Sequence, residues 1–287
     1  MKPRMPIVAA TLVLLLTVVT LAADPTPIDK GQRVLSAGHS FHVFMPNILK
    51  ELAQAGGVKD HVQVDLQSIG GSRVIQHWDL ADEKNKAKTA LKTGKVDVFT
   101  LSPIFLPDDG IANFTKLALE HNPNIRITVQ EFWMPYDRPE KDKTSKPDRN
   151  ARTAAELDEM HAAYFKSMDA QVVELNKQHG KEVLYVVPVG QAVIGLRKKI
   201  IAGEAPGVKT QEELFTDPIG HVRPPIQVLN AYCHYAVIYR KSPVGLPMPG
   251  LLEKAKNPDW DAKLNKLLQE LAWEAVKNHP LSGVKEK

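Results

Sequence analysis

Residues 33–41 read RVLSAGHSF, a short strand-like run that passes directly into a turn. The segment after Phe41 has the character of a helix, so Ser40 lies at a strand-to-helix turn. A serine in that place is either a helix cap or a candidate nucleophile. Because a serine hydroxyl is a poor nucleophile until an imidazole takes its proton, the second interpretation requires a histidine elsewhere in the chain.

A histidine with a neighbouring acid occurs far downstream, where residues 215–221 read FTDPIGH. The carboxylate of Asp217 would fix the tautomer of His221 and stabilise the charge that its ring gains. The order Ser40, Asp217, His221 is compatible with a catalytic triad, since triads are defined by geometry and not by sequence position. For the acid and the imidazole to meet, residues 218–220 must bulge, which a proline and a glycine permit. If a backbone carbonyl held His221 instead, a Ser40–His221 dyad would result.

The fold class follows from apolar runs that alternate with helix-like segments. This alternation predicts parallel strands joined by right-handed helical crossovers, in a three-layer α/β/α sandwich with a mostly parallel sheet. In such sheets ligands bind outside the carboxyl ends of the strands, where Ser40 and the pair Gly70-Gly71 would both lie. The predicted strands are Arg33–Ala37, Val62–Ile69, Val96–Leu101, Ile125–Trp133 and Val183–Val187.

Two helices and one long loop are predicted with clear boundaries. A helix over 154–179 has Thr153 as its N-cap, apolar residues three or four apart, and Gly180 at its end. A last helix is expected near Asp259 to Lys277, with an apolar face that closes the domain. The run from Tyr136 to Arg152 is charged, contains prolines and lacks periodicity, which indicates a solvated loop or, alternatively, a mobile lid.

Residues 1–23 have the order of a secretory signal peptide: Lys2 and Arg4, then an apolar run, then Ala22-Ala23. Cleavage would make the protein secreted or periplasmic. Since the run is nearly long enough to cross a bilayer, an uncleaved membrane anchor is the alternative. Residues 24–287 are expected to form a single α/β domain.

The formal charge of the 287-residue chain is +4, and without Lys2 and Arg4 it is about +2, with acids and bases interspersed. Nucleic-acid binders concentrate basic residues on one face, so no nucleic-acid partner is expected. Cys233 is the one cysteine, which excludes an intramolecular disulfide. It is expected to be a small buried apolar residue.

Three short blocks resemble those of the SGNH (GDSL-type) hydrolases: Gly38–Phe41 after the first strand, GGSR at 70–73 after the second, and Asp217 with His221 before a terminal helical region. The resemblance covers the chain from about residue 33 to residue 245. It implies a flavodoxin-like α/β/α sandwich in which Ser40 attacks an ester carbonyl, His221 acts as general base and then acid, and Asp217 orients His221. No cofactor and no metal is implied.

The same resemblance implies an oxyanion hole built from the nucleophile's own N–H, a glycine after the second strand and an asparagine after the third. A glycine suits this role because no side chain obstructs the approach of the oxyanion. No asparagine follows Val96–Leu101 directly, and loss of one donor can cost on the order of a hundredfold in rate. The candidate donors are Gly71, Gly70, Ser102, Thr100 and Asn113.

The predicted function is an exported serine hydrolase that cleaves an ester, with a short acyl or acetyl ester of a carbohydrate or small molecule as substrate. The alternative is a secreted ligand- or carbohydrate-binding protein that has the same fold but no catalytic activity. The reason for this alternative is the absent asparagine of the oxyanion hole. A membrane-anchored interaction protein is a third, if residues 1–23 are retained. His39, His42, His61 and His77, with Asp65 and Asp79, could suggest a metal site, but their spacing matches no tight ligand pattern.

Overall fold

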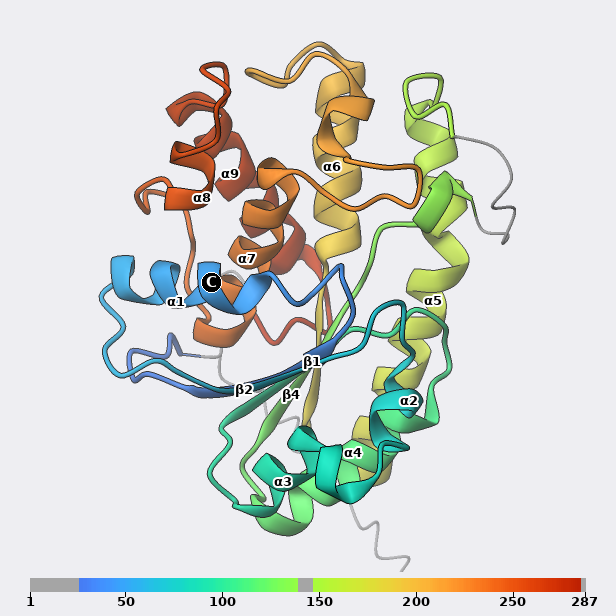
Figure 1. Cartoon of the computed structure of the whole chain (residues 1–287), viewed down its shortest axis with the longest axis vertical. Coiled ribbons are helices and arrows are strands. Elements are labelled where there is room, and N and C mark those ends of the chain that lie inside the picture. The colour runs from blue at the N-terminus through green and yellow to red at the C-terminus, as the bar shows by residue number, and fades with distance from the viewer. Residues whose placement is uncertain (1–25, 139–146, 285–287) are drawn as a thin grey trace, which may run out of the picture.

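A computed structural model describes residues 26–138 and 147–284 (Figure 1). The expected signal segment, residues 1–23, lies outside the described residues. Five parallel strands form one sheet in the order β2-β1-β3-β4-β5. Every predicted strand is confirmed, with ends that differ by a few residues: β1 (Arg33–Gly38), β2 (Val62–Ser68), β3 (Val98–Leu101), β4 (Arg126–Gln130) and β5 (Leu184–Val187).

Helices cover both faces of the sheet and complete the expected three layers (Figure 1). Among the described residues no helix is both long enough and apolar enough to cross a membrane. One face carries α1 (Met45–Ala55), α6 (Val189–Ile201), α7 (Pro224–Tyr239), α8 (Gly250–Glu253) and α9 (Ala262–Asn278). The other face carries α2 (Val74–Trp78), α3 (Lys86–Lys92), α4 (Asp109–His121) and α5 (Ala154–His179). Three short 3₁₀ turns are η1 (Asp82–Lys84), η2 (Pro135–Asp137) and η3 (Gln211–Leu214).

The two faces of the sheet differ in polarity. Leu35, Phe99 and Ile127 are in register across neighbouring strands and pack with α2–α5 in one apolar core. The next residues in register, Ser36, Thr100 and Thr128, are fully buried and polar. Since successive side chains of a strand point to opposite faces, this polar row lies under α1 and α7. The sheet therefore carries buried hydrogen-bonding groups on the face below the turn of Ser40.

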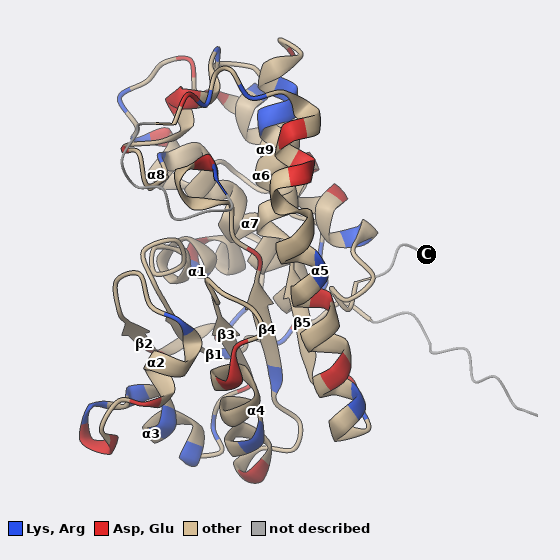
Figure 2. Ribbon diagram, turned by 90° about the vertical axis from the view of Figure 1, so that its right-hand side faces the viewer, with Lys and Arg blue, Asp and Glu red and all other residues tan. Residues whose placement is uncertain are grey.

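Helix ends follow the expected sequence signals. The Thr153 hydroxyl of α5 accepts the Glu156 N–H, the Glu156 carboxylate accepts the Thr153 N–H, and Gly180 ends the helix at φ +65°. Helix α7 has no charged residue, is buried almost throughout and packs against α1, α6 and α9; it carries neither blue nor red in Figure 2. Cys233, on α7, is buried as expected, and burial raises the pKa of its thiol.

Candidate active site

Ser40 lies in the turn between β1 and α1, at the carboxyl edge of the sheet. The strand order 2-1-3-4-5 reverses direction between β1 and β3, and ligands of such folds bind at that switch point. Helix α1 begins at Met45 and has Phe44, not Ser40, as its N-cap. The helix-cap interpretation of Ser40 is therefore wrong, because its hydroxyl contacts another partner.

That partner is His221. The Ser40 Oγ lies 2.8 Å from His221 Nε2, and His221 Nδ1 lies 2.5 Å from Asp217 Oδ2. An ionised carboxylate only accepts hydrogen bonds, so Nδ1 carries the imidazole proton and Nε2 accepts the Ser40 hydroxyl. About a third of the His221 and Asp217 side chains is exposed, so the three groups meet at the surface of the molecule. The geometry is that of a nucleophile, a base and an orienting acid.

A tight turn brings the Asp217 carboxylate and the His221 ring together, although the two residues are four apart in the sequence. The Asp217 Oδ1 accepts the backbone N–H groups of Gly220 and His221 at 2.9 and 3.1 Å, and Gly220 has φ +107°, a region that favours glycine. Burial alone would raise the pKa of the Asp217 carboxyl, but the hydrogen bonds from His221 and Gly220 outweigh it and lower this pKa. Asp217 is therefore held ionised beside His221.

A second hydroxyl–imidazole contact, Ser72 Oγ to His77 Nε2 at 2.8 Å, has the opposite polarity. Gln67 Nε2 donates to His77 Nδ1, so Nε2 carries the proton and donates to Ser72. The Ser72 hydroxyl in turn donates to the carbonyl of Ile69 at 2.9 Å. This pair holds the Gly70-Gly71 turn and offers no base to its serine.

Two further pairs lie beneath the turn of Ser40. His39 Nδ1 accepts the Phe41 N–H, so its Nε2–H donates to Ser102 Oγ at 3.2 Å, and the Ser102 hydrogen is free to donate elsewhere. Thr100 contacts His42 Nε2 at 2.9 Å, but both are fully buried and no carboxylate supports the ring. Of these hydroxyl–imidazole contacts, only Ser40–His221 combines an accepting imidazole, a carboxylate and access to solvent.

The candidate oxyanion donors differ in their surroundings. Among the described residues, neither the Ser40 N–H nor the Gly71 N–H has an acceptor in the protein, so both are available. Gly71 has φ +61°, which explains a glycine there, whereas Gly70 shows no such constraint. Ser102 follows β3 and is buried beside His39. Asn113 lies in the interior of α4 and makes no hydrogen bond to the three groups of the site within the described chain.

Trp133 and Arg149 support the site and were not predicted to do so. The Trp133 indole N–H donates to the carbonyl of Gly220 at 2.8 Å, and its ring stacks on Phe41 with centroids 4.5 Å apart. Phe41 also meets the His221 ring edge-on at 5.5 Å. Arg149 and Asp137 are buried, so the described ends of 136–152 are not solvated throughout as expected, and residues 139–146 of that predicted loop lie outside the described residues. Arg149 is paired with Glu212, and Asp137 accepts two hydrogen bonds from Arg197, which offsets the cost of burying these charges.

The four histidines of the hypothetical metal site have separate hydrogen-bond partners, and His61 contacts the hydroxyl of Tyr239. Within 26–138 and 147–284, no group of three or more His, Cys, Asp or Glu side chains is arranged to hold a metal ion. A cavity of about 500 Å³, lined by Lys50, Gln54 and residues 57–61, lies at the amino end of β2, which is the end of the sheet opposite to Ser40.

Comparison with known proteins adds information about the fold. The sequence matches no protein-family model and no curated protein. A DUF4886 family protein from Bacteroides uniformis is similar in structure, with a TM-score of 0.56 at 15% identity over 86% of this chain and 95% of that chain. The two chains share a fold.

Two other solved structures give lower scores. One is described as a GDSL-like lipase from Parabacteroides merdae, with a TM-score of 0.45 at 13% identity over 72% of this chain and 94% of that one. The other is WcbI, described as a polysaccharide biosynthesis enzyme, with a TM-score of 0.35 at 14% identity over 76% and 73% of the two chains. Scores this low support no argument about function, so the function is inferred from the geometry of the site.

Proposed function

We propose that the protein is a serine hydrolase of SGNH type that cleaves an ester through an acyl-enzyme. The observation that carries the proposal is the continuous chain of contacts from Ser40 Oγ through His221 to Asp217. A binding protein would have no need for a partly exposed hydroxyl whose proton is accepted by an acid-supported imidazole.

In the first half-reaction Ser40 Oγ forms a bond to the ester carbonyl carbon, and its proton passes to His221 Nε2. The negative charge on the carbonyl oxygen is stabilised by the N–H groups of Ser40 and Gly71, with the Ser102 hydroxyl as third donor. When the tetrahedral intermediate collapses, the alcohol leaves with the proton from His221. Water then attacks the acyl-enzyme, gives its proton to His221, and releases the carboxylic acid and the Ser40 hydroxyl.

The proposed substrate is a short acyl or acetyl ester, with acetylated carbohydrates as the first class to examine, and the proposed location is outside the cytoplasm, with residues 1–23 removed. The test is hydrolysis of p-nitrophenyl acetate, longer acyl esters and an acetylated oligosaccharide by the mature protein, Ser40→Ala and His221→Ala. Activity that both changes abolish supports the hydrolase. The same slow hydrolysis by all three folded proteins on every ester contradicts it and favours the binding protein.

A further inference from the structure

The segment that carries the acid and the imidazole, residues 217–221, has an unusually complete set of hydrogen bonds. Each of its backbone carbonyls accepts from a donor within the described chain. The donors are Arg149 Nη2 to Asp217 and Pro218, the Tyr136 N–H to Ile219, the Trp133 indole N–H to Gly220, and the Thr216 N–H to His221. Segment 217–221 is therefore held in one conformation by groups outside it.

Arg149 is the charged member of this set. One guanidinium nitrogen, Nη2, lies 3.1 Å from the carbonyl oxygen of Asp217 and 2.9 Å from that of Pro218. A guanidinium has five N–H donors in a plane, and hydrogen bonds from a charged donor are stronger than those from a neutral one. The two hydrogens of Nη2 supply one donor for each carbonyl, and the positive charge strengthens both hydrogen bonds.

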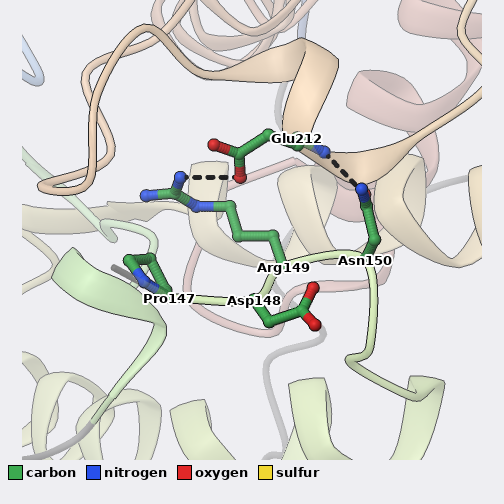
Figure 3. Close-up of a pocket in the computed structure, with 5 residues that line it drawn as sticks. All are labelled: Pro147, Asp148, Arg149, Asn150 and Glu212. Atoms are coloured by element: carbon green, nitrogen blue, oxygen red, sulfur yellow. Dashed lines mark hydrogen bonds and ion pairs between the residues drawn. The ribbon is translucent and has the colours of Figure 1, made fainter. Parts of the chain in front are cut away.

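The guanidinium is itself fixed in place. Nη1 donates to the Glu212 carboxylate at 3.0 Å, and the guanidinium carbon lies 4.2 Å from the centroid of the Phe215 ring (Figure 3 shows the Arg149–Glu212 contact). Arg149 is only 1% exposed, and its Nε lies 3.8 Å from the buried Asp137. Because these contacts lock the rotamer of Arg149, its guanidinium can hold residues 217–221 in a fixed position.

We infer that Arg149 is a positioning residue for the candidate triad: it holds residues 217–221 so that Asp217 Oδ2 faces His221 Nδ1 and His221 Nε2 faces Ser40. The inference rests on the proposed hydrolase function. Arg149 touches neither Ser40 nor the His221 ring, so it acts only through the backbone carbonyls that it binds. A displacement of about 1 Å in a catalytic group can cost about a hundredfold in rate, which sets the size of the expected effect.

A cavity beside Arg149 allows a direct test. It has a volume of about 250 Å³ and is lined by Pro147, Asp148, Arg149, Asn150 and Glu212 (Figure 3). In Arg149→Ala the space of the lost side chain would join this cavity, next to the carbonyls of Asp217 and Pro218. A guanidinium ion from solution could then occupy the vacated place and donate to the same oxygens.

The experiment compares wild type, Arg149→Ala and Arg149→Lys with Arg126→Ala as matched control. Arg126 also donates a guanidinium N–H to a backbone carbonyl, that of Ile238 at 2.9 Å, but it lies at the amino end of β4. We expect kcat of Arg149→Ala to fall about a hundredfold with KM nearly unchanged, and millimolar guanidinium to restore a substantial part of it. Arg149→Lys should show a smaller loss of kcat. If Arg149→Ala does not fold, the comparison of Arg149→Lys with wild type is the test. Folded Arg126→Ala should keep the wild-type kcat.

Two outcomes overturn the inference: unchanged kcat in the folded Arg149 variants, or a loss of kcat that guanidinium does not reverse at any subdenaturing concentration. The downfield proton resonance of His221 Nδ1–H, which reports its hydrogen bond to Asp217, gives a readout independent of turnover. We expect it in wild type, not in Arg149→Ala, and again after addition of guanidinium. If wild type shows this resonance but hydrolyses no ester, the proposed function fails while the role of Arg149 is still decided by the resonance.

Discussion

Trp133 donates its indole N–H to the carbonyl oxygen of Gly220, with 2.8 Å between the nitrogen and the oxygen. The same ring stacks on Phe41, the residue that follows Ser40, at an interplanar angle of 12°. Trp133 therefore joins the turn of Ser40 to the segment of His221, which are far apart in the sequence. Only 1% of Trp133 is exposed, so its packing holds the connection between the two segments fixed.

Replacing Trp133 by Phe should lower kcat about tenfold with little change in KM. The phenyl ring keeps contact with Phe41 but leaves the Gly220 carbonyl without its donor, a loss of about 1 kcal/mol or slightly more, which corresponds to about a factor of ten in rate. Steady-state kinetics on an aryl ester measure this. The matched control is Trp260→Phe, since the Trp260 indole N–H has no acceptor among the described residues. Equal kcat values for the two variants would refute the role of Trp133.

Asp217→Asn should reduce kcat by roughly 10³- to 10⁴-fold with the fold intact. The amide can turn an N–H toward His221 Nδ1, which favours the tautomer in which Nε2 carries the proton and cannot accept that of Ser40. Circular dichroism checks folding, and kcat is measured on the same preparation. A loss smaller than about tenfold would indicate that Ser40 and His221 work as a dyad and that Asp217 has only a structural role.

Gly71→Ala and Gly70→Ala distinguish the two candidate glycines of the oxyanion hole. An added Cβ meets no atom within 4 Å at either position, so crowding is not a factor. Gly71 has φ +61°, where a non-glycine residue costs about 1–2 kcal/mol and the turn is expected to shift. We predict a loss of kcat of at least about tenfold for Gly71→Ala, since oxyanion donors are sensitive to position, and wild-type kcat for Gly70→Ala. The reverse result would assign the donor to Gly70.

The folded protein should lose stability steeply as the pH falls from about 6.5 toward 5. Burial is the main cause that lowers the pKa of six described histidines: to about 3 for His39, to about 4 for His42, His61, His77 and His161, and well below the ordinary value for His234. Below pH 6.5 the unfolded chain binds protons that these folded residues do not, so the free energy of unfolding decreases with decreasing pH. Burial raises the pKa of the Glu131 carboxyl, which opposes the trend, but it is one group against six histidines.

Urea unfolding at a series of pH values measures this slope, to which each buried histidine contributes up to about 1.4 kcal/mol per pH unit. His161→Gln should make the slope shallower, while His121→Gln, a change of an exposed side chain at the end of α4, is the control. A free energy of unfolding that does not change between pH 6.5 and 5 would show that these histidines are protonated in the folded state.

The sheet could be predicted because its signals are local. Runs such as Val98–Leu101 are apolar and bounded by turn residues, and α5 has a capping box at Thr153 and a glycine at 180, so neighbours in sequence define each element. Parallel strands also require crossovers, which makes the sandwich follow from the alternation. The spacing of Asp217 and His221 likewise predicted a turn that Gly220 permits.

The supporting residues could not be predicted, because their roles depend on contacts between distant segments. Arg149 lies in a charged run that resembles solvent-exposed loop, and only its approach to Glu212 and to residues 217–218 explains its burial. Trp133 has the apolar character of any core residue; nothing in its neighbours indicates that its N–H binds Gly220. The polar row Ser36, Thr100 and Thr128 appears only once the register is known, since each residue alone is an ordinary strand residue.

The measurement that tests the central claim most directly is covalent labelling of the mature protein with a fluorophosphonate, followed by intact-mass analysis and peptide mapping. A nucleophilic serine displaces fluoride from this reagent, while ordinary serines do not react at the same rate. We predict one adduct per chain, located on Ser40, absent in Ser40→Ala and strongly slowed in His221→Ala. No adduct on the folded wild type, or an adduct on another residue that forms equally fast in Ser40→Ala, would contradict the assignment of Ser40 as the nucleophile.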